Sequence, residues 1–179
     1  MRVRYALACL GLTLLLVAAA SAQRRRDPLT SPEIDQLRDT ALEPELRLKL
    51  YVKFVRARLA SLEQMRSDPK TTDRARQTHD GLEDFLAVYD ELNDNIDMYV
   101  DRKDDVRKPL KAVIEADTEF QAKLRALKGA AGIAPAEAKE YQFVLSNAIE
   151  TLDSSAEDHR KLMAEQEESA KHKKKAKNQ

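Results

Sequence analysis

The feature that most limits the possible folds is a run of apolar residues spaced alternately three and four positions apart. Twelve of its fourteen positions are apolar, and its phase does not slip over more than six heptads. Such a pattern is typical of a long helix that packs along one face. The fourteen positions are Leu82, Phe85, Tyr89, Leu92, Ile96, Tyr99, Lys103, Val106, Leu110, Val113, Asp117, Phe120, Leu124 and Leu127.

Composition supports an all-α fold. The 179 residues include only four glycines and six prolines, which leaves little material for the turns of a many-stranded sheet. A charged fraction of 35% excludes an integral membrane bundle. We therefore predict an elongated antiparallel helical bundle with three long helices.

The start of the first helix is marked by Ser31, Pro32 and Glu33, which supply an N-cap, a proline at the first position and an acid in the first turn. Pro44 predicts a kink or short break before a second helical segment. That segment ends at Ser67-Asp68-Pro69. Because the turn is short, the helix that follows must run antiparallel.

The central helix is predicted to cover residues 72–128, kinked at Pro109. A proline in a helix interior costs about 3 kcal/mol or more. A loop would normally shift the heptad register, however, and residues 101–108 contain no glycine. We therefore favour one continuous, kinked helix, and the alternative is two helices broken near residues 104–109.

The clearest break lies at residues 129–135, with glycine at its start and Pro135 at its end. The last helix is predicted over residues 135–169, and residues 170–179 are predicted to be a disordered lysine-rich tail. The bundle domain then spans residues 31–169. Its first and last helices would fold back along opposite halves of the central helix.

The N-terminus resembles a secretory signal peptide. Arg2 and Arg4 precede an apolar run that ends in Ala20-Ser21-Ala22, which predicts cleavage after Ala22. An uncleaved membrane anchor is the alternative. We expect a periplasmic or extracellular protein with residues 1–22 removed and a flexible, basic segment at residues 23–30. Cys9, the single cysteine, would be lost with the signal peptide.

Charge is distributed unevenly along the chain. All 31 acidic residues but only 21 of the 31 basic ones lie within residues 27–170, so the predicted body is acidic and both ends are basic. Folding the hairpin around residues 68–71 would place Arg56 near Glu83 and Arg58 near Asp80. We interpret most of these charges as solvated ion pairs that help to set the register of the hairpin.

Three polar residues fall at predicted core positions: Lys103, Asp117 and, on the last helix, His159. Folding back the last helix would bring Lys103 near Asp158 and His159, with Asp35 of the first helix close by. A buried polar layer that sets register is the favoured interpretation. The alternative is a ligand-binding or proton-coupled site in the middle of the bundle.

These features favour a non-enzymatic structural or interaction module, with no predicted catalytic residue, metal or cofactor. Its partners would be a protein, a second copy or an anionic envelope surface, but not nucleic acid. The alternative is a small-ligand or b-type haem carrier, in which His159 or His79 would pair with Met98, Met163 or Met65. The predicted surface-tethering residues are Arg24, Arg25, Arg26, Lys171, Lys173, Lys174, Lys175 and Lys177.

Overall fold

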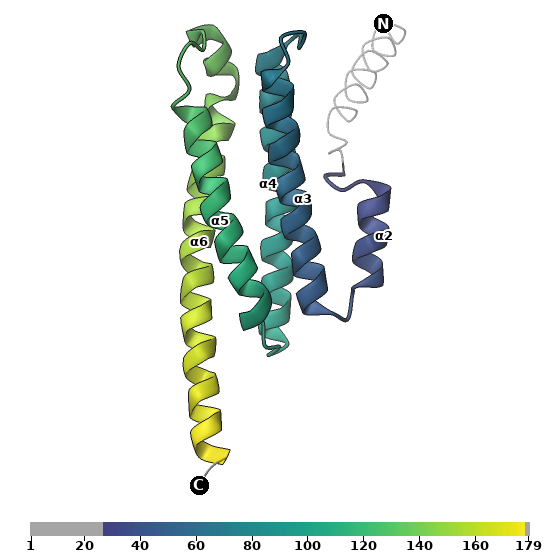
Figure 1. Ribbon diagram of the computed structural model, residues 1–179, viewed down its shortest axis with the longest axis vertical. Helices are drawn as coiled ribbons and strands as arrows, with labels where there is room; N and C mark the ends of the chain where they lie inside the picture. Colours follow the sequence, from purple (N-terminus) through teal and green to yellow (C-terminus); the bar gives the residue numbers. More distant parts are fainter. Residues whose placement is uncertain (1–26, 178–179) are drawn as a thin grey trace, which may run out of the picture.

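A computed structural model describes residues 27–177 of the chain, and this part contains helices and no strand (Figure 1). The predicted signal peptide and Arg24, Arg25 and Arg26 lie outside the described residues. The helices are α2 (Ser31–Asp39), α3 (Pro44–Ser67), α4 (Arg74–Asp101), α5 (Arg107–Lys128) and α6 (Pro135–Lys177). No helix of the described part is both long and apolar enough to cross a lipid bilayer.

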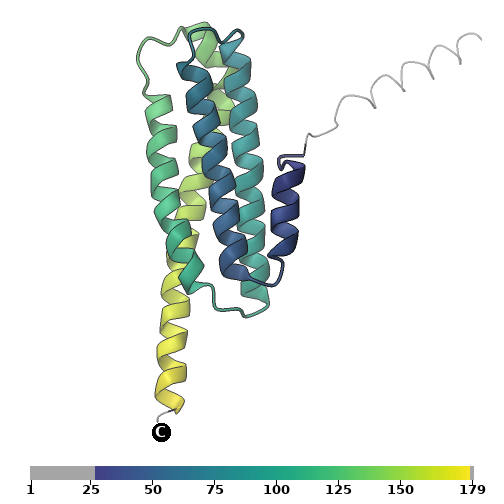
Figure 2. The ribbon, with the colours of Figure 1, turned by 45° about the vertical axis from the view of Figure 1, so that its right-hand side comes forward.

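Two helical hairpins, α3 with α4 and α5 with α6, pack against each other to form a four-helix bundle. In the packed arrangement α4 lies beside α6 and α3 beside α5, so each of these neighbouring pairs runs parallel (Figure 2). The short α2 lies outside the bundle against α3. The fold is therefore all-helical as predicted, but the bundle is not made of three long helices.

The predicted continuous helix over residues 72–128 is wrong, because α4 ends at Asp101 and α5 begins at Arg107. Lys103 takes a left-handed conformation with φ of 63°. The amide of Lys103 donates to the carbonyl of Val100, and the amide of Asp104 donates to that of Tyr99. This is a Schellman C-cap, with lysine at the position that usually holds glycine, so the glycine signal for a helix end was absent.

Pro109 disrupts no helical hydrogen bond. It is the third residue of α5, within the first turn, where backbone amides have no intrahelical partner. The break leaves the apolar phase intact, since the 3–4 spacing resumes at Val106 after the loop. Twelve of the fourteen positions of the run are buried, Leu127 is half-buried and Lys103 is exposed.

The C-terminal segment is helical. The predicted helix end at Ser169 is corrected, because α6 continues to Lys177 and extends beyond the end of the bundle (Figures 1 and 2). Alanine, glutamate and lysine are good helix formers, and lysines near a helix C-terminus interact favourably with its dipole. Local propensity therefore explains a helix where no apolar periodicity predicted one.

The predicted ion pairs of the α3–α4 hairpin do not form. Arg56 instead binds Glu119 on α5 at 2.9 Å, and Arg58 binds Glu33 on α2 at 2.6 Å. Both differences have one cause: α3 has three neighbours, and these two arginines face α5 and α2 instead of α4. A prediction made for an isolated hairpin could not include those neighbours.

Candidate functional site

A buried polar network joins three of the four bundle helices at one carboxylate. Asp117 on α5 is fully buried, and its Oδ1 accepts a hydrogen bond of 2.9 Å from the Tyr89 hydroxyl on α4. Its Oδ2 lies 2.8 Å from Nδ1 of His159 on α6. Tyr89 is fully buried and His159 is 4% exposed. A buried carboxylate needs such partners, because its desolvation is otherwise costly.

Burial raises the pKa of the Tyr89 hydroxyl far above its usual value, and the nearby charge of Asp117 raises that pKa further. Tyr89 therefore stays neutral and keeps its proton for donation to Asp117. Its ring stacks on that of Phe85, with centroids 5.8 Å apart. Phe85 in turn meets Phe120 edge to face, so aromatic rings wall this part of the core.

The network reaches the surface of the bundle between α4 and α6. Ser155 on α6 is half-buried, and its side chain lies close enough to the Tyr89 hydroxyl to influence the pKa of that group. It also accepts a 3.1 Å hydrogen bond from the side-chain amide of Asn93 on α4. In the heptad pattern Tyr89 counts as an apolar core residue, and nothing in that pattern marks Ser155 or Asn93. The available signal was Tyr89 itself, because a buried tyrosine hydroxyl usually has a hydrogen-bond partner.

Of the three predicted core polar residues, Asp117 and His159 are brought together and Lys103 is not. Lys103 lies exposed in the α4–α5 loop, so its prediction as a core residue is corrected. The physical reason is the Schellman turn, which rotates this position out of the heptad face. Its predicted neighbour Asp35 lies on α2 and pairs with Arg38 at 2.8 Å.

The methionines considered as haem ligands for His159 are either substantially exposed or displaced from it along a helix. Met98 is 41% exposed on α4. Met163 lies four residues after His159 on the same helix, too near along one face to bind the opposite side of a porphyrin. Met65 is in the last turn of α3, nine residues after Arg56. Arg56 binds Glu119 on α5, two residues from Asp117, and so marks the level of the polar network. Met65 therefore lies about 13 Å along α3 from that level.

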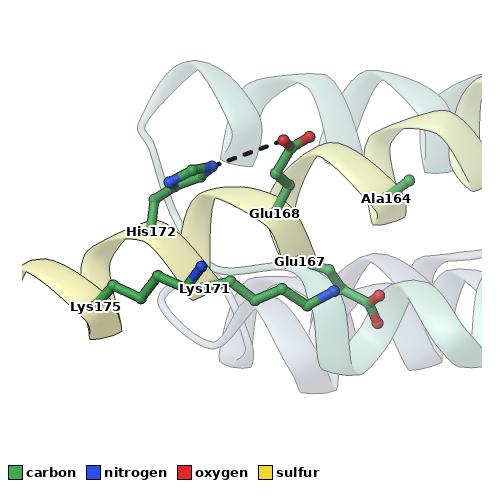
Figure 3. Close-up of a pocket in the computed structure, with 6 residues that line it drawn as sticks. All are labelled: Ala164, Glu167, Glu168, Lys171, His172 and Lys175. Atoms are coloured by element: carbon green, nitrogen blue, oxygen red, sulfur yellow. Dashed lines mark ion pairs between the residues drawn. The ribbon is translucent and has the colours of Figure 1, made fainter.

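The lysine-rich end of α6, defined as residues 171–177, is a second candidate site. Gln166 makes the last hydrogen bonds from α6 to the bundle, one to the Asp104 carbonyl and one from the Val106 amide. The helix then continues for eleven residues to Lys177. Its side chains at residues 171–175 are exposed, and Figure 3 shows a shallow recess there formed by residues of α6 alone.

Comparison of the chain with protein-family models, curated proteins and solved structures finds no match.

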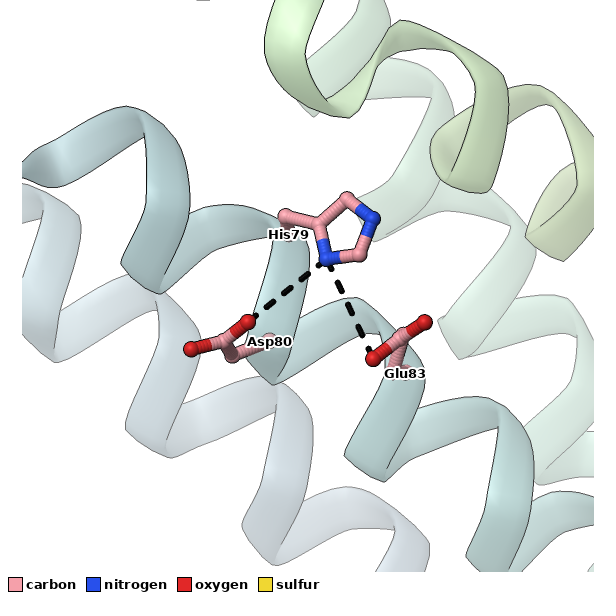
Figure 4. Close-up of side chains that lie close together, drawn as sticks. All are labelled: His79, Asp80 and Glu83. Atoms are coloured by element: carbon pink, nitrogen blue, oxygen red, sulfur yellow. Dashed lines mark ion pairs between the residues drawn. The ribbon is translucent and has the colours of Figure 1, made fainter. Parts of the chain in front are cut away.

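A third cluster consists of His79, Asp80 and Glu83 on α4 (Figure 4). Nδ1 of His79 lies 3.6 Å from the Asp80 carboxylate and 3.9 Å from that of Glu83. Imidazole and carboxylate groups are ligands of divalent transition metals. All three side chains are substantially exposed on one helix, and Arg76 also lies 4.0 Å from Asp80. Surface pairs at this spacing are ordinary on helices.

A groove of about 220 Å³ lies between α3 and α5 near their C-terminal ends. Leucines of both helices line it, and the rim carries Glu63 and Lys123, which pair with each other at 2.7 Å. Arg66, also on the rim, hydrogen-bonds to Thr78. The charged groups at the rim are thus already paired within the fold. The lysine-rich end is the site whose charges have the fewest partners, because none of its lysines with a described side chain forms an ion pair within the described residues.

Proposed function

We propose that the protein is an exported, non-enzymatic interaction module that binds anionic surfaces of the cell envelope through the lysine-rich end of α6. The observation that carries this proposal is the projection of α6. The helix continues past its last hydrogen bonds with the bundle, and the lysines lie on the part that projects. A hydrogen bond from Arg107 and, more weakly, the charge of Lys173 lower the pKa of the Asp105 carboxyl in the α4–α5 loop. No ion pair, however, joins the described lysine side chains of this end to the acidic body, and those side chains are exposed.

The expected affinity follows from the number of lysines. A basic side chain near an anionic membrane contributes about 1 kcal/mol. Four lysines are thus expected to raise affinity by two to three powers of ten, at about 1.4 kcal/mol per power. The attraction acts over about 10 Å at 0.1 M salt and only about 3 Å at 1 M. Binding must therefore weaken steeply as salt is added.

The test is sedimentation of the protein with vesicles of phosphatidylglycerol and phosphatidylcholine, compared with phosphatidylcholine alone. The lysine-end variant carries Lys171→Gln, Lys173→Gln, Lys174→Gln and Lys175→Gln. The matched control makes the same change at four exposed lysines of the bundle body, Lys53, Lys111, Lys139 and Lys161.

We expect the wild type and the control variant to bind the anionic vesicles at low salt, and the lysine-end variant to lose most of this binding. If the lysine-end variant and the control variant bound the anionic vesicles equally, net charge and not the projecting end would govern attachment. Binding to phosphatidylcholine alone would also contradict the proposal.

A further inference from the structure

The outer surface of α4 is acidic over its last three turns. Residues 90–101 contain five acidic residues and no lysine or arginine. We call Glu91, Asp94, Asp97 and Asp101 the acidic face. These four side chains are exposed, and none of them forms an ion pair with another described residue. Asp94, Asp97 and Asp101 follow at steps of three and four, so they share one side of the helix.

The lysine-rich end of the same chain cannot reach this face while α6 is helical. Helices α4 and α6 run parallel, and Gln166 contacts the loop just beyond the end of α4. Every residue after Gln166 therefore continues away from the acidic face (Figure 1). The chain carries two surfaces of opposite charge that are unable to meet within one molecule.

We infer that the acidic face of α4 binds the lysine-rich end of α6 from a second copy of this chain. Two copies placed end to end, related by a two-fold axis, would each lay the projecting part of α6 along α4 of the other. The lengths are compatible, because the lysine-rich end from Lys171 to Lys177 spans about 9 Å of helix and the acidic face from Glu91 to Asp101 spans about 15 Å. Both contacts form together, so the assembly closes as a dimer.

Electrostatics makes this association dependent on salt. The four acidic residues and the lysines that face them are all solvent-exposed, so their attraction is screened over about 3 Å at 1 M salt, compared with about 30 Å at 0.01 M. The inference does not rest on the proposed function. An anionic surface would compete for the same lysines, but a dimer could form in its absence.

The test is sedimentation equilibrium of the protein produced from its full coding sequence, at low and high salt, with two charge-reversed variants. The first variant carries Lys171→Glu, Lys173→Glu, Lys174→Glu and Lys175→Glu. The second carries Glu91→Lys, Asp94→Lys, Asp97→Lys and Asp101→Lys. A control variant carries Lys53→Glu, Lys111→Glu, Lys139→Glu and Lys161→Glu in the bundle body. Thermal unfolding checks that every variant is folded.

We expect the wild type and the control to double in mass at low salt and to return to the mass of one chain at 1 M salt. Each charge-reversed variant alone should be monomeric, because it presents like charges at both contacts. An equal mixture of the two should restore the dimer, since both contacts then join opposite charges. A monomeric wild type at low salt, a dimer of either reversed variant alone, a mixture that stays monomeric, or assemblies larger than two would each overturn the inference.

Discussion

Two parts of the same helix are held in place by different forces. Residues 141–159 of α6 pack into the core and contribute His159 to a buried polar network. Residues 167–177 have no apolar stripe and project from the bundle. The first part depends on contacts with α4 and α5, whereas the second depends on local helix propensity. Changes to the two parts should therefore differ sharply in their effect on stability.

The largest effect is expected from Asp117→Ala. This change removes the shared acceptor of Tyr89 and His159 and leaves polar groups buried without it. Leaving a buried hydrogen-bonding group without its partner costs about 1–3 kcal/mol, and two such groups lose their partner here. Chemical denaturation should show a loss of this size in the free energy of unfolding.

The control is a triple variant, Asp117→Leu with Tyr89→Phe and His159→Leu. Replacement of a whole buried polar group by apolar residues of similar volume is often neutral or stabilising. We expect the triple variant to be more stable than Asp117→Ala. If Asp117→Ala itself lost less than about 1 kcal/mol, the network would not be a main structural contact.

Much of the fold could be predicted because apolar spacing reports directly on burial. The breaks at Pro44 and at residues 129–135 are confirmed by the bounds of α3, α5 and α6. The α4–α5 break was mispredicted because its signal is conformational: Lys103 adopts a positive φ that its residue type does not favour. The pairing of α4 with α6 could not be inferred, since it depends on how two hairpins dock.

The candidate site could be predicted only in part, because its contacts also depend on how the helices dock. Asp117 and His159 could be found because each places a polar group at a core position. Their partner Tyr89 was missed, because a tyrosine suits an apolar seam and shows its polar role only when the acceptor is known. The lysine-rich end was recognised from composition, but its projection on a helix depends on where α6 leaves the bundle.

An intermediate effect is expected from Tyr89→Phe, which removes one hydrogen bond to Asp117. A hydrogen bond to a charged group contributes about 1.5–3 kcal/mol. Tyr141→Phe is the matched control, because the buried Tyr141 hydroxyl has no partner within the described residues. We expect that control to be nearly neutral at pH 7.

The same pair of variants tests the raised pKa of Tyr89. Its folded-state pKa lies above the unfolded value of 10.0, so its contribution to stability is complete below about pH 10. That contribution is lost as pH rises above 10, because the unfolded chain releases a proton that the folded chain retains. The wild type should thus lose up to about 1.4 kcal/mol more per pH unit than Tyr89→Phe. Equal slopes in alkaline denaturation would contradict the assignment.

The smallest effect on stability is expected from a chain that ends at Ala170, which lacks the lysine-rich end. Surface changes away from packed features usually alter stability by no more than about 0.5 kcal/mol. Amide exchange at high salt should show the reason: residues 171–177 should exchange much faster than residues 141–159, because a helix end without tertiary contacts opens readily. Residues 141–159 should be protected in both chains. A loss above about 1 kcal/mol, or slow exchange at residues 171–177 at high salt, would mean that this end packs against the bundle, and the contrast between the two parts of α6 would fail.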